Sequence, residues 1–471
     1  MISREFGQVS SNGKAGKIVA GAVMERLLKR PEGLLVATFG FLIVAGTLLL
    51  RLGVCQTTGD IGWLDCWFTA TSAVCVTGLI THDTATEFTR VGQTVILVLI
   101  QLGGLGLMTF AALAFQLLNK HVSFQSQAAV HDMLFQTELR GSLRLALRRI
   151  LLITLVIESL GALFLYIGIL RGDAPHGDVF HAVFLAISAF CNAGFSVYSD
   201  NIVGLRDSPW FMVTLMALIV SGGLGYTVIL ELVRRGWGRL RGAPRPPTWS
   251  LNTRVALRTS FTLILIGTVA LLLTGLTIHE QGFGSQLLNA LFQSVTARTA
   301  GFNTVDVGAL PVPAMMILIP LMFIGGSPGG CAGGIKTTTF RVWISRIRAR
   351  ILRRDDVCVL DRKIPHEVVR RAALILAIAV LWNALGVYLL AVSENVGDEF
   401  QLEDLIFEQF SAFGTVGLST GVTPHLSIVG KLWIILSMFI GRLGPLTIAL
   451  VVVRQQAQPP FTYPSERVMI G

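Results

Sequence analysis

SAVCVTGL, at residues Ser72–Leu79, is the first of four versions of one short motif. The other three are SAFCNAGF (Ser188–Phe195), VTARTAGF (Val295–Phe302) and SAFGTVGL (Ser411–Leu418). Their glycines are separated by 116, 107 and 116 residues, and each motif lies between two long apolar segments. Self-similarity at a nearly fixed period predicts a chain built from four copies of one structural unit.

The composition of the 471-residue chain is typical of a membrane protein and excludes an ordinary soluble domain. Hydrophobic residues make up 52% of the chain and charged residues only 14%, and its mean hydropathy is +0.67. Apolar runs recur that are long enough to cross about 30 Å of hydrocarbon as helices. We place eight such spans at Gly33–Gly53, Val91–Leu118, Ile150–Leu170, Trp210–Val233, Ser260–Ile278, Pro313–Ile335, Ala372–Ala391 and Ile428–Val453.

Each pair of spans encloses a semi-apolar segment that leads into one of the four motifs. At about ten residues these segments are too short to cross as helices. We interpret them as re-entrant half-helices, whose non-helical ends need protein or an aqueous cavity around them. They are Trp63–Cys75, Val179–Cys191, Gln286–Ala297 and Glu403–Gly414. The predicted fold class is therefore an all-α membrane protein with four helix–pore loop–helix repeats around a pseudo-four-fold pore.

Few side chains in the motifs could ligate a cation, so the backbone is the candidate ligand. Small or β-branched residues precede each glycine, and glycine permits the dihedral angles that keep successive carbonyls directed at one axis. Four such strands present rings of carbonyl oxygens that can replace the hydration shell of a potassium ion. A single glycine loop would favour close helix packing instead, but four at regular spacing favour a filter. The candidate filter residues are Val76, Thr77, Gly78, Asn192, Ala193, Gly194, Thr299, Ala300, Gly301, Thr415, Val416 and Gly417.

Basic residues are concentrated on one side of the predicted spans. Thirty of the 38 Lys and Arg residues precede the first span, follow an even-numbered span or lie in the tail. The positive-inside rule therefore places both termini in the cytoplasm and the pore loops outside. The net charge of +10 lies where this topology requires it, so it indicates no nucleic-acid partner. The six cysteines lack paired spacing and the eight histidines are scattered, so we predict neither a disulfide framework, a zinc site nor an enzyme active site.

The second helix of each unit carries a further glycine cluster, and the third copy departs from the others. Gly103-Gly104-Leu105-Gly106 and Gly222-Gly223-Leu224-Gly225 indicate tight helix crossing or a local break. The third copy, Gly325–Lys336, holds six glycines and a proline, which cannot maintain a continuous helix. A phosphate-binding loop is excluded because Ile335 separates Gly334 from Lys336. We predict an intramembrane gate loop formed by Gly325, Gly326, Ser327, Gly329, Gly330, Gly333, Gly334 and Lys336.

Three charged residues fall inside apolar segments. Arg442 replaces a glycine of the other copies, and an intramembrane arginine is by default functional and paired. We expect it to hydrogen-bond carbonyls of the gate loop and to hold the loop closed, with a purely architectural bond to helix-end carbonyls as the alternative. Lys336 either snorkels to the interface or lines the path, and Glu158 is either paired or faces the bundle interior. The acidic residues that open the half-helices are expected to act as caps, with an outer ring that concentrates cations as the alternative; they are Asp65, Asp178, Glu403 and Asp404.

With these motifs the chain resembles the Trk/Ktr/HKT superfamily of potassium transporters, from about Glu32 to Arg454. The four filter motifs, GGSPGGCAGGIKTTTF and GRLGPLT carry the resemblance, which is greatest to the bacterial Ktr-type membrane subunit. It implies a homodimer with one pore per protomer, potassium as the transported ion and a cytoplasmic nucleotide-binding ring of RCK/KTN type as partner. It also implies that Gly78 favours potassium, because a serine at this position accompanies sodium transport in some plant members.

The predicted function is gated potassium uptake by a multi-pass protein of the cell (inner) membrane, in contact with membrane lipid. A sodium-permeable or sodium-coupled cation transporter on the same scaffold is the alternative, and sodium stimulation of potassium transport is left open. A secondary transporter of another solute is disfavoured because such proteins usually contain inverted repeats, whereas these repeats run parallel. The predicted organisation is a cytoplasmic segment at 1–32, repeats at 33–120, 146–235, 254–352 and 367–454, and a cytoplasmic tail at 455–471.

Overall fold

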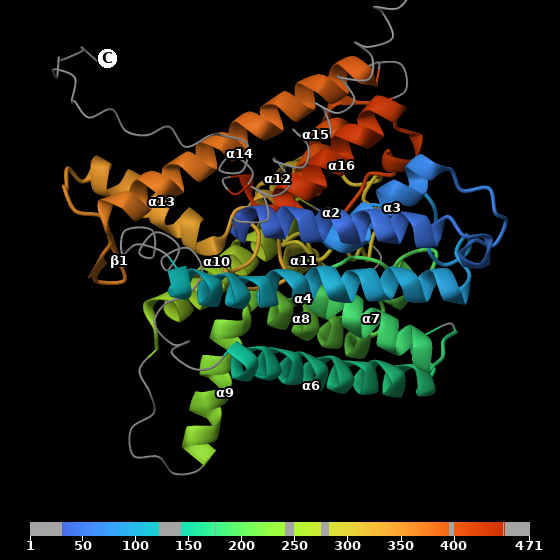
Figure 1. Cartoon of the computed structure of the whole chain (residues 1–471), viewed down its shortest axis with the longest axis horizontal. Coiled ribbons are helices and arrows are strands. Elements are labelled where there is room, and N and C mark those ends of the chain that lie inside the picture. Colours follow the sequence, from blue (N-terminus) through green and yellow to red (C-terminus); the bar gives the residue numbers. More distant parts are fainter. Residues whose placement is uncertain are drawn as a thin grey trace, which may run out of the picture.

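A computed structural model describes residues 31–121, 143–174, 176–240, 249–274, 282–394, 400–445 and 447 of the chain. The regular elements of the described part are almost all helices (Figure 1). The α-helices are α2 (Pro31–Leu50), α3 (Trp63–Cys75), α4 (Arg90–His121), α6 (Leu143–Leu170), α7 (Val179–Cys191), α8 (Pro209–Leu224), α9 (Tyr226–Leu240), α10 (Leu251–Leu273), α11 (Phe283–Thr296), α12 (Val312–Phe323), α13 (Thr337–Ile351), α14 (His366–Ser393), α15 (Leu402–Gly414) and α16 (Ile428–Leu443). The remaining elements are the 3-10 helices η1 (Gly53–Cys55), η2 (Val203–Leu205) and η3 (Thr423–His425) and an antiparallel hairpin of β1 (Cys358–Val359) and β2 (Arg362–Lys363). The predicted segment before residue 31 and the predicted tail at 455–471 lie outside the described residues.

The described helices form four units of the same order, each with an outer helix, a half-helix and an inner helix. The units are α2–α3–α4, α6–α7–α8, α10–α11–α12 and α14–α15–α16. Every half-helix packs against the inner helix of the preceding unit, in the pairs α4 with α7, α8 with α11, α12 with α15 and α16 with α3. Because the last of these pairs joins the fourth unit to the first, the units close into a ring.

Large apolar side chains cover the outer helices. Phe41 of α2, Leu155 of α6, Phe261 of α10 and Leu381 of α14 are each at least 65% exposed. Among the described residues, these four helices are long and apolar enough to cross a membrane, and α8 with α9 would make a fifth if the bent pair is one span. Exposed apolar surface on every outer helix is what lipid contact requires, so the fold is that of an all-α, multi-pass membrane protein.

The inner helices differ from the continuous spans that the sequence predicts. The predicted span Trp210–Val233 is interrupted because α8 ends at Leu224 and α9 leaves it at 110°, as the transverse direction of α9 in Figure 1 shows. Gly225 at the break has φ +86°, a conformation that glycine adopts at no steric cost. The predicted span Pro313–Ile335 is helical only to Phe323. In the predicted span Ile428–Val453, α16 ends at Leu443 and Gly444 interrupts the helix, and residues 448–453 of this span lie outside the described residues. In all three, the helix ends at or within two residues of the glycine cluster that the sequence contains.

The half-helices are the part of the fold that the sequence predicts most closely. Helices α3 and α7 have the predicted bounds, whereas α11 begins three residues and α15 one residue before the predicted start. Each carries at least one fully buried phenylalanine, and one from each helix is Phe68, Phe184, Phe292 or Phe407. The centre of the molecule is therefore filled by the half-helices, which rigidly position the motifs at their inner ends.

Candidate ion-conduction site

The four motifs share one backbone path where the half-helices end. The first residue of each candidate filter triplet is left-handed, with φ between 49° and 74°, and the glycine that closes the triplet has φ between 69° and 97°. Left-handed backbone at a non-glycine residue costs about 1 kcal/mol or more, so the surrounding core holds it in place. A path that alternates in this way turns successive carbonyls toward one side of the strand. The first residues are Val76, Asn192, Thr299 and Thr415.

The four motif glycines lie in one closed ring of contacts. A Cβ atom added to Gly78 would overlap the carbonyl oxygen of Ala193, and one added to Gly301 would overlap that of Val416. At Gly194 the added atom would lie 3.0 Å from the carbonyl oxygen of Ala300. At Gly417 it would overlap the carbonyl oxygen of Thr77, which returns the ring to the first motif. All twelve candidate filter residues therefore lie together, around four carbonyl oxygens from four strands, and their role in ion binding stays a prediction.

Serine side chains of the half-helices hold two of the four glycines. The hydroxyl oxygen of Ser72 accepts from the backbone N–H of Gly78 at 3.0 Å, and that of Ser411 accepts from Gly417 at 3.1 Å. In the second repeat the hydroxyl of Ser188 donates to the carbonyl of Phe195 at 2.7 Å. The third repeat has Val295 at this position. These bonds fix the outer end of a filter strand to the helix that precedes it.

Glycines of the inner helices allow close contact with the half-helices. A Cβ at Gly103, Gly222 or Gly441 would overlap the carbonyl oxygen of Val74, Phe190 or Phe413, respectively. The predicted tight crossing is therefore correct for the first two copies, and the fourth copy shares it. The third copy departs from this pattern, because a Cβ at Gly325 would overlap the carbonyl of Gly333 instead. The third inner helix is thus replaced at this level by a loop that packs against itself.

The predicted gate loop has a stem and a tip. The stem is made by backbone bonds from Gly325 to Ile335 (2.9 Å), from Ile335 to Phe323 (3.1 Å) and from Thr337 to Gly326 (3.0 Å). The tip, Ser327–Ala332, lies against the break in the second inner helix. There Ser327 donates to the carbonyl of Gly223 at 2.9 Å, Cys331 donates to Gly222 at 3.1 Å, and Tyr226 donates to Gly329 at 3.1 Å.

The loop packs against the inner end of the candidate filter. A Cβ at Gly333 would overlap the hydroxyl oxygen of Thr415, which is the innermost residue of the fourth candidate filter strand. A Cβ at Gly225 would lie 2.5 Å from the carbonyl oxygen of Pro328. The small residues of the loop are therefore needed for contact with the filter on one side and with the bent inner helix on the other. This position fits the predicted gate, whose opening and closing stay a prediction.

Three basic side chains donate to carbonyls of this loop. The Arg442 guanidinium donates to Cys331 through Nη1 and to the carbonyl of Gly103 through Nη2 at 3.0 Å. Lys336 Nζ donates to the carbonyl of Ala332 at 2.5 Å, so this lysine folds back onto the loop. Arg298 Nη2 donates to the carbonyl of Gly325 at 3.0 Å. The contact expected between Arg442 and the loop is present, and its role in holding the loop closed stays a prediction.

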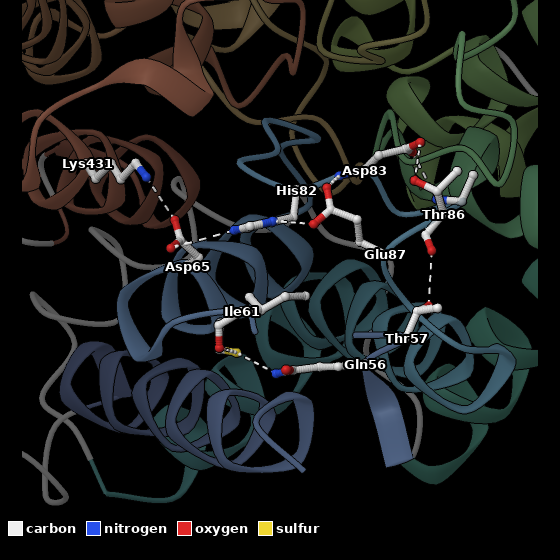
Figure 2. Close-up of polar contacts among 11 residues, drawn as sticks. Gln56, Thr57, Ile61, Asp65, His82, Asp83, Thr86, Glu87 and Lys431 are labelled. Carbon is white, nitrogen blue, oxygen red and sulfur yellow. Dashed lines mark hydrogen bonds and ion pairs between the residues drawn. The ribbon is translucent and has the colours of Figure 1, made fainter. Parts of the chain in front are cut away.

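Outside the filter, polar contacts join the fourth repeat to the first. In Figure 2 Lys431, Asp65, His82 and Glu87 form one chain of contacts. Lys431 Nζ lies 2.9 Å from Asp65, and the His82 ring lies 3.7 Å from Asp65 and 2.5 Å from Glu87. Burial acts to raise the pKa of Asp65, but the hydrogen bond and charge of Lys431 outweigh it, and the pKa is lowered. The ion pair therefore stabilises the contact between α16 and α3 with a charged aspartate.

A similar contact joins the first repeat to the second. Arg90 Nη2 lies 3.1 Å from Asp178, and Asp178 caps α7 by accepting from the backbone N–H of His181 at 3.0 Å. Hydrogen bonds from His181, with the charge of Arg90, lower the pKa of Asp178. The capping role predicted for Asp178 is confirmed. It is wrong for Asp65, which lies in the first turn of α3 behind the N-cap Gly62 and whose carboxylate faces Lys431. It is also wrong for Glu403 and Asp404, which lie in the first turn of α15 behind the N-cap Gln401.

The structure also contains polar residues that sequence reasoning missed. Arg298 lies between the end of α11 and the candidate filter residue Thr299, at a position where the other repeats have Cys75, Cys191 and Gly414. An alignment of the four repeats would have found it. Glu408 of α15 is fully buried and accepts from Ser419 and, at 3.0 Å, from Thr423, beyond the fourth motif. Glu158, left open by the sequence, is buried and accepts from Gln101 of α4 at 3.1 Å, so it is paired.

Known proteins resemble the chain along most of its length. The family model described as TrkH, cation transport protein, matches residues 24–461. The chain is 35% identical to the Ktr system potassium uptake protein B of Bacillus subtilis, over 94% of this chain and 97% of that protein. It is 34% identical to the potassium/sodium uptake protein NtpJ of Enterococcus hirae, over 95% and 99%. The crystal structure of the potassium transporter TrkH from Vibrio parahaemolyticus has the same fold, with a TM-score of 0.69 at 17% identity over 89% of this chain and 83% of that one.

Proposed function

Because the chain belongs to the TrkH family of cation transport proteins, and is a transporter rather than an enzyme, we propose that it takes up potassium through a filter of backbone carbonyls. The observation that carries the proposal is the closed ring, in which each motif glycine lies against a carbonyl oxygen of the next motif. The carbonyls of Thr77, Ala193, Ala300 and Val416 form one layer of ligands. Four oxygens from four strands can replace water around a potassium ion without any charged side chain.

Two further observations support potassium as the ion. The relatives named above are potassium or potassium/sodium uptake proteins, and the first filter glycine, Gly78, is the residue that the family resemblance links to potassium. The negative ends of the four half-helices point toward the ring and favour a cation. A membrane potential of about 100 mV supplies about 2.3 kcal/mol for each inward charge, so uptake down this gradient needs no ATP hydrolysis.

We propose that the loop at residues 325–336 is the gate. Its tip is hydrogen-bonded to the second inner helix and to Arg442, and Gly333, the residue after the tip, packs against Thr415 at the inner end of the filter. The tip therefore occupies the path that an ion would follow after leaving the filter. Opening requires that the tip leave Thr415 and that the bonds to Gly222, Gly223 and Arg442 break.

The assembly and topology that the sequence implies are part of the same proposal. The protein is a homodimer with one pore per protomer, its pore loops face outward and both termini are cytoplasmic. The repeats occupy 33–120, 146–235, 254–352 and 367–454. The words "Ktr system" in the name of the Bacillus subtilis relative support a cytoplasmic regulatory ring of RCK/KTN type as partner. Potassium is the transported ion, and no organic cofactor is assigned to this chain.

A sodium-permeable transporter on the same scaffold is the second candidate. It is favoured by one observation, the resemblance to a potassium/sodium uptake protein over nearly the whole chain. The two candidates differ only in how strongly the ring discriminates between ions, or in whether sodium stimulates potassium flux.

The test is ion flux into proteoliposomes that contain the purified chain, alone and with its regulatory partner, under an inward potential. We expect potassium or rubidium uptake that survives excess sodium and that is lost in the Gly78→Ala, Gly194→Ala, Gly301→Ala and Gly417→Ala variants. Equal sodium and potassium flux would support the second candidate. Flux of neither ion in the presence of the partner would refute the filter, as would glycine variants with unchanged selectivity.

A further inference from the structure

The third repeat differs from the others at the junction between half-helix and filter. The residue before the first filter position is Cys75, Cys191 or Gly414 in three repeats and Arg298 in the third. Arg298 is 9% exposed, although it lies beside the filter and between apolar helices. A buried guanidinium is costly unless it is hydrogen-bonded, so the fold gains something specific from it.

Arg298 is bonded to the stem of the gate loop and not to its tip. Its Nη2 donates to the carbonyl of Gly325 at 3.0 Å, and Gly325 also donates to Ile335 across the stem at 2.9 Å. With Gly223 and Gly326, Arg298 lines a small cavity between α8, α10 and the loop. Its Nε atom is buried without a hydrogen-bond partner among the described residues. The bond to Gly325 is thus the direct polar link from the third filter strand to the loop.

The tip is held by a different set of contacts. Arg442 donates to Cys331, and the carbonyls of Gly222 and Gly223 accept from Cys331 and Ser327. All of these come from the fourth and second repeats. The stem bond of Arg298 comes from the third repeat itself, from the residue next to Thr299. Movement of the tip can therefore break the contacts of Arg442 and leave the bond of Arg298 in place.

We propose that Arg298 is a positioning residue that ties the stem of the gate loop to the third filter strand, so that stem and strand move as one unit. The inference rests on the proposed function, because it assigns the residue a role within the filter and gate. It gives the two buried arginines different roles. Arg442 holds the tip and sets how often the path is open, whereas Arg298 sets the geometry of Thr299 and hence the discrimination between ions.

The test compares Arg298→Met with Arg442→Met in the full chain, in proteoliposomes with the regulatory partner. The two substitutions are matched, because each removes a buried guanidinium that donates to a carbonyl of the same loop. We expect the potassium-to-sodium flux ratio of R298M to fall by up to about tenfold, the effect of losing one charge-assisted hydrogen bond. In R442M we expect flux without the partner to rise and the flux ratio to stay at the wild-type value.

Hydrogen exchange provides a readout that does not depend on flux. In wild-type protein the stem and residues 298–302 should be protected together. R298M should raise exchange in both segments, whereas R442M should raise it at the tip alone. The inference is overturned if folded R298M keeps the wild-type flux ratio, or if its exchange pattern equals that of R442M. If R298M does not fold, Arg298→Gln replaces it and is judged by the same two readouts.

The two proposals fail in different ways. A wild-type chain that carries neither ion with its partner refutes the proposed function, and joint protection of the stem and strand then still decides whether Arg298 connects them. A wild-type chain that conducts potassium while R298M retains its selectivity refutes the role of Arg298 alone.

Discussion

The four repeats are alike around the filter and differ from one another on its inner side. Around the filter, the four repeats use the same parts, which are a buried phenylalanine, a left-handed residue and a glycine against the next carbonyl. Below the filter, the inner helices diverge: α4 continues to His121, α8 bends by 110° at Gly225, α12 gives way to a loop, and α16 ends beside Arg442. In the proposed function, the four like parts form one ring around an ion, and the repeat that differs from the rest supplies the gate.

The charged residues follow the same division. Those at the outer ends of the half-helices, Asp65 with Lys431 and Asp178 with Arg90, join adjacent repeats in pairs of opposite charge. Those on the inner side of the filter, Arg298, Lys336 and Arg442, each donate to a backbone carbonyl of the same loop, and Arg442 also donates to Gly103 of α4. Ion pairs therefore connect adjacent repeats on the outer side, whereas basic side chains bond to the loop at residues 325–336 on the inner side. Four predictions test this comparison, in order of decreasing effect.

The largest effect is expected from Gly417→Ala in the ring. The new Cβ would overlap the carbonyl oxygen of Thr77, and the backbone at Gly417 has φ +93°, so both the strand and its neighbour have to shift. We expect loss of selective potassium flux in proteoliposomes. Gly40→Ala in α2 is the control, because a Cβ there meets nothing within 4 Å, and it should leave flux unchanged. Selective potassium flux in G417A would contradict the proposal that the four glycines form one selective ring.

Gly333→Ala should displace the gate loop without changing the selectivity of the filter. Its Cβ would overlap the Thr415 hydroxyl, so the tip can no longer seat beneath the filter. We expect partner-independent potassium flux to rise by about tenfold or more, as for a shift of about 1.4 kcal/mol in the closed state. The double variant Gly333→Ala with Thr415→Ala removes the overlapping atoms and should restore low flux. Unchanged flux in G333A would argue against the loop as a gate.

The Ser72→Ala and Ser411→Ala variants should weaken the ring more gently. Each removes one hydrogen bond to the backbone N–H of a filter glycine, worth about 1 kcal/mol. We expect the potassium-to-sodium flux ratio to fall by about fivefold, measured as competition between the two ions. Ser221→Ala is the control, since this hydroxyl bonds within its own helix to Ala217. A Ser72 variant that changes gating but not selectivity would contradict the separate roles of the filter and the loop.

The smallest effect is expected at the contact between the fourth and first repeats. Asp65 has a lowered pKa in the folded protein, so its pair with Lys431 stabilises the fold above the unfolded pKa of about 3.9 and is lost as pH falls through the folded value. Asp65→Asn should lower stability by about 1 kcal/mol at neutral pH, measured as the thermal midpoint in detergent. The difference in stability from wild type should shrink as the pH falls below about 3.9 and vanish once the pH is below the lowered pKa of folded Asp65.

Arg90→Met provides the comparison for this last prediction. The Arg90 and Asp178 side chains are 52% and 57% exposed, against 15% and 18% for Lys431 and Asp65. Exposed pairs contribute little, because water and salt screen them. We expect no measurable change in the midpoint for R90M. A larger loss for R90M than for Asp65→Asn would show that closure of the ring does not depend on the half-buried pair.

The sequence by itself determined the repeat, the half-helices and the positions of the four glycine motifs, whose role as a filter stays a prediction. These follow from local patterns, because each pattern predicts the same structure in every repeat. The patterns are the length of an apolar run, a glycine at fixed spacing and a short segment between two spans. It also located the interrupted third helix, since six glycines and a proline exclude a helix in any context. Family membership, confirmed by the comparisons, follows from the same motifs.

Only the tertiary structure decided which residues meet across repeats. Three contacts join segments that are far apart in the chain: the ring of glycines, the pair of Asp65 with Lys431 and the bond from Arg298 to Gly325. The bend of the second inner helix at Gly225 was likewise visible only in the structure. An inner helix can span, bend or stop at a glycine cluster with little difference in local preference. The outcome depends on which side chains of the neighbouring repeats pack against the helix. It also depends on which groups donate hydrogen bonds to the free carbonyls at its end.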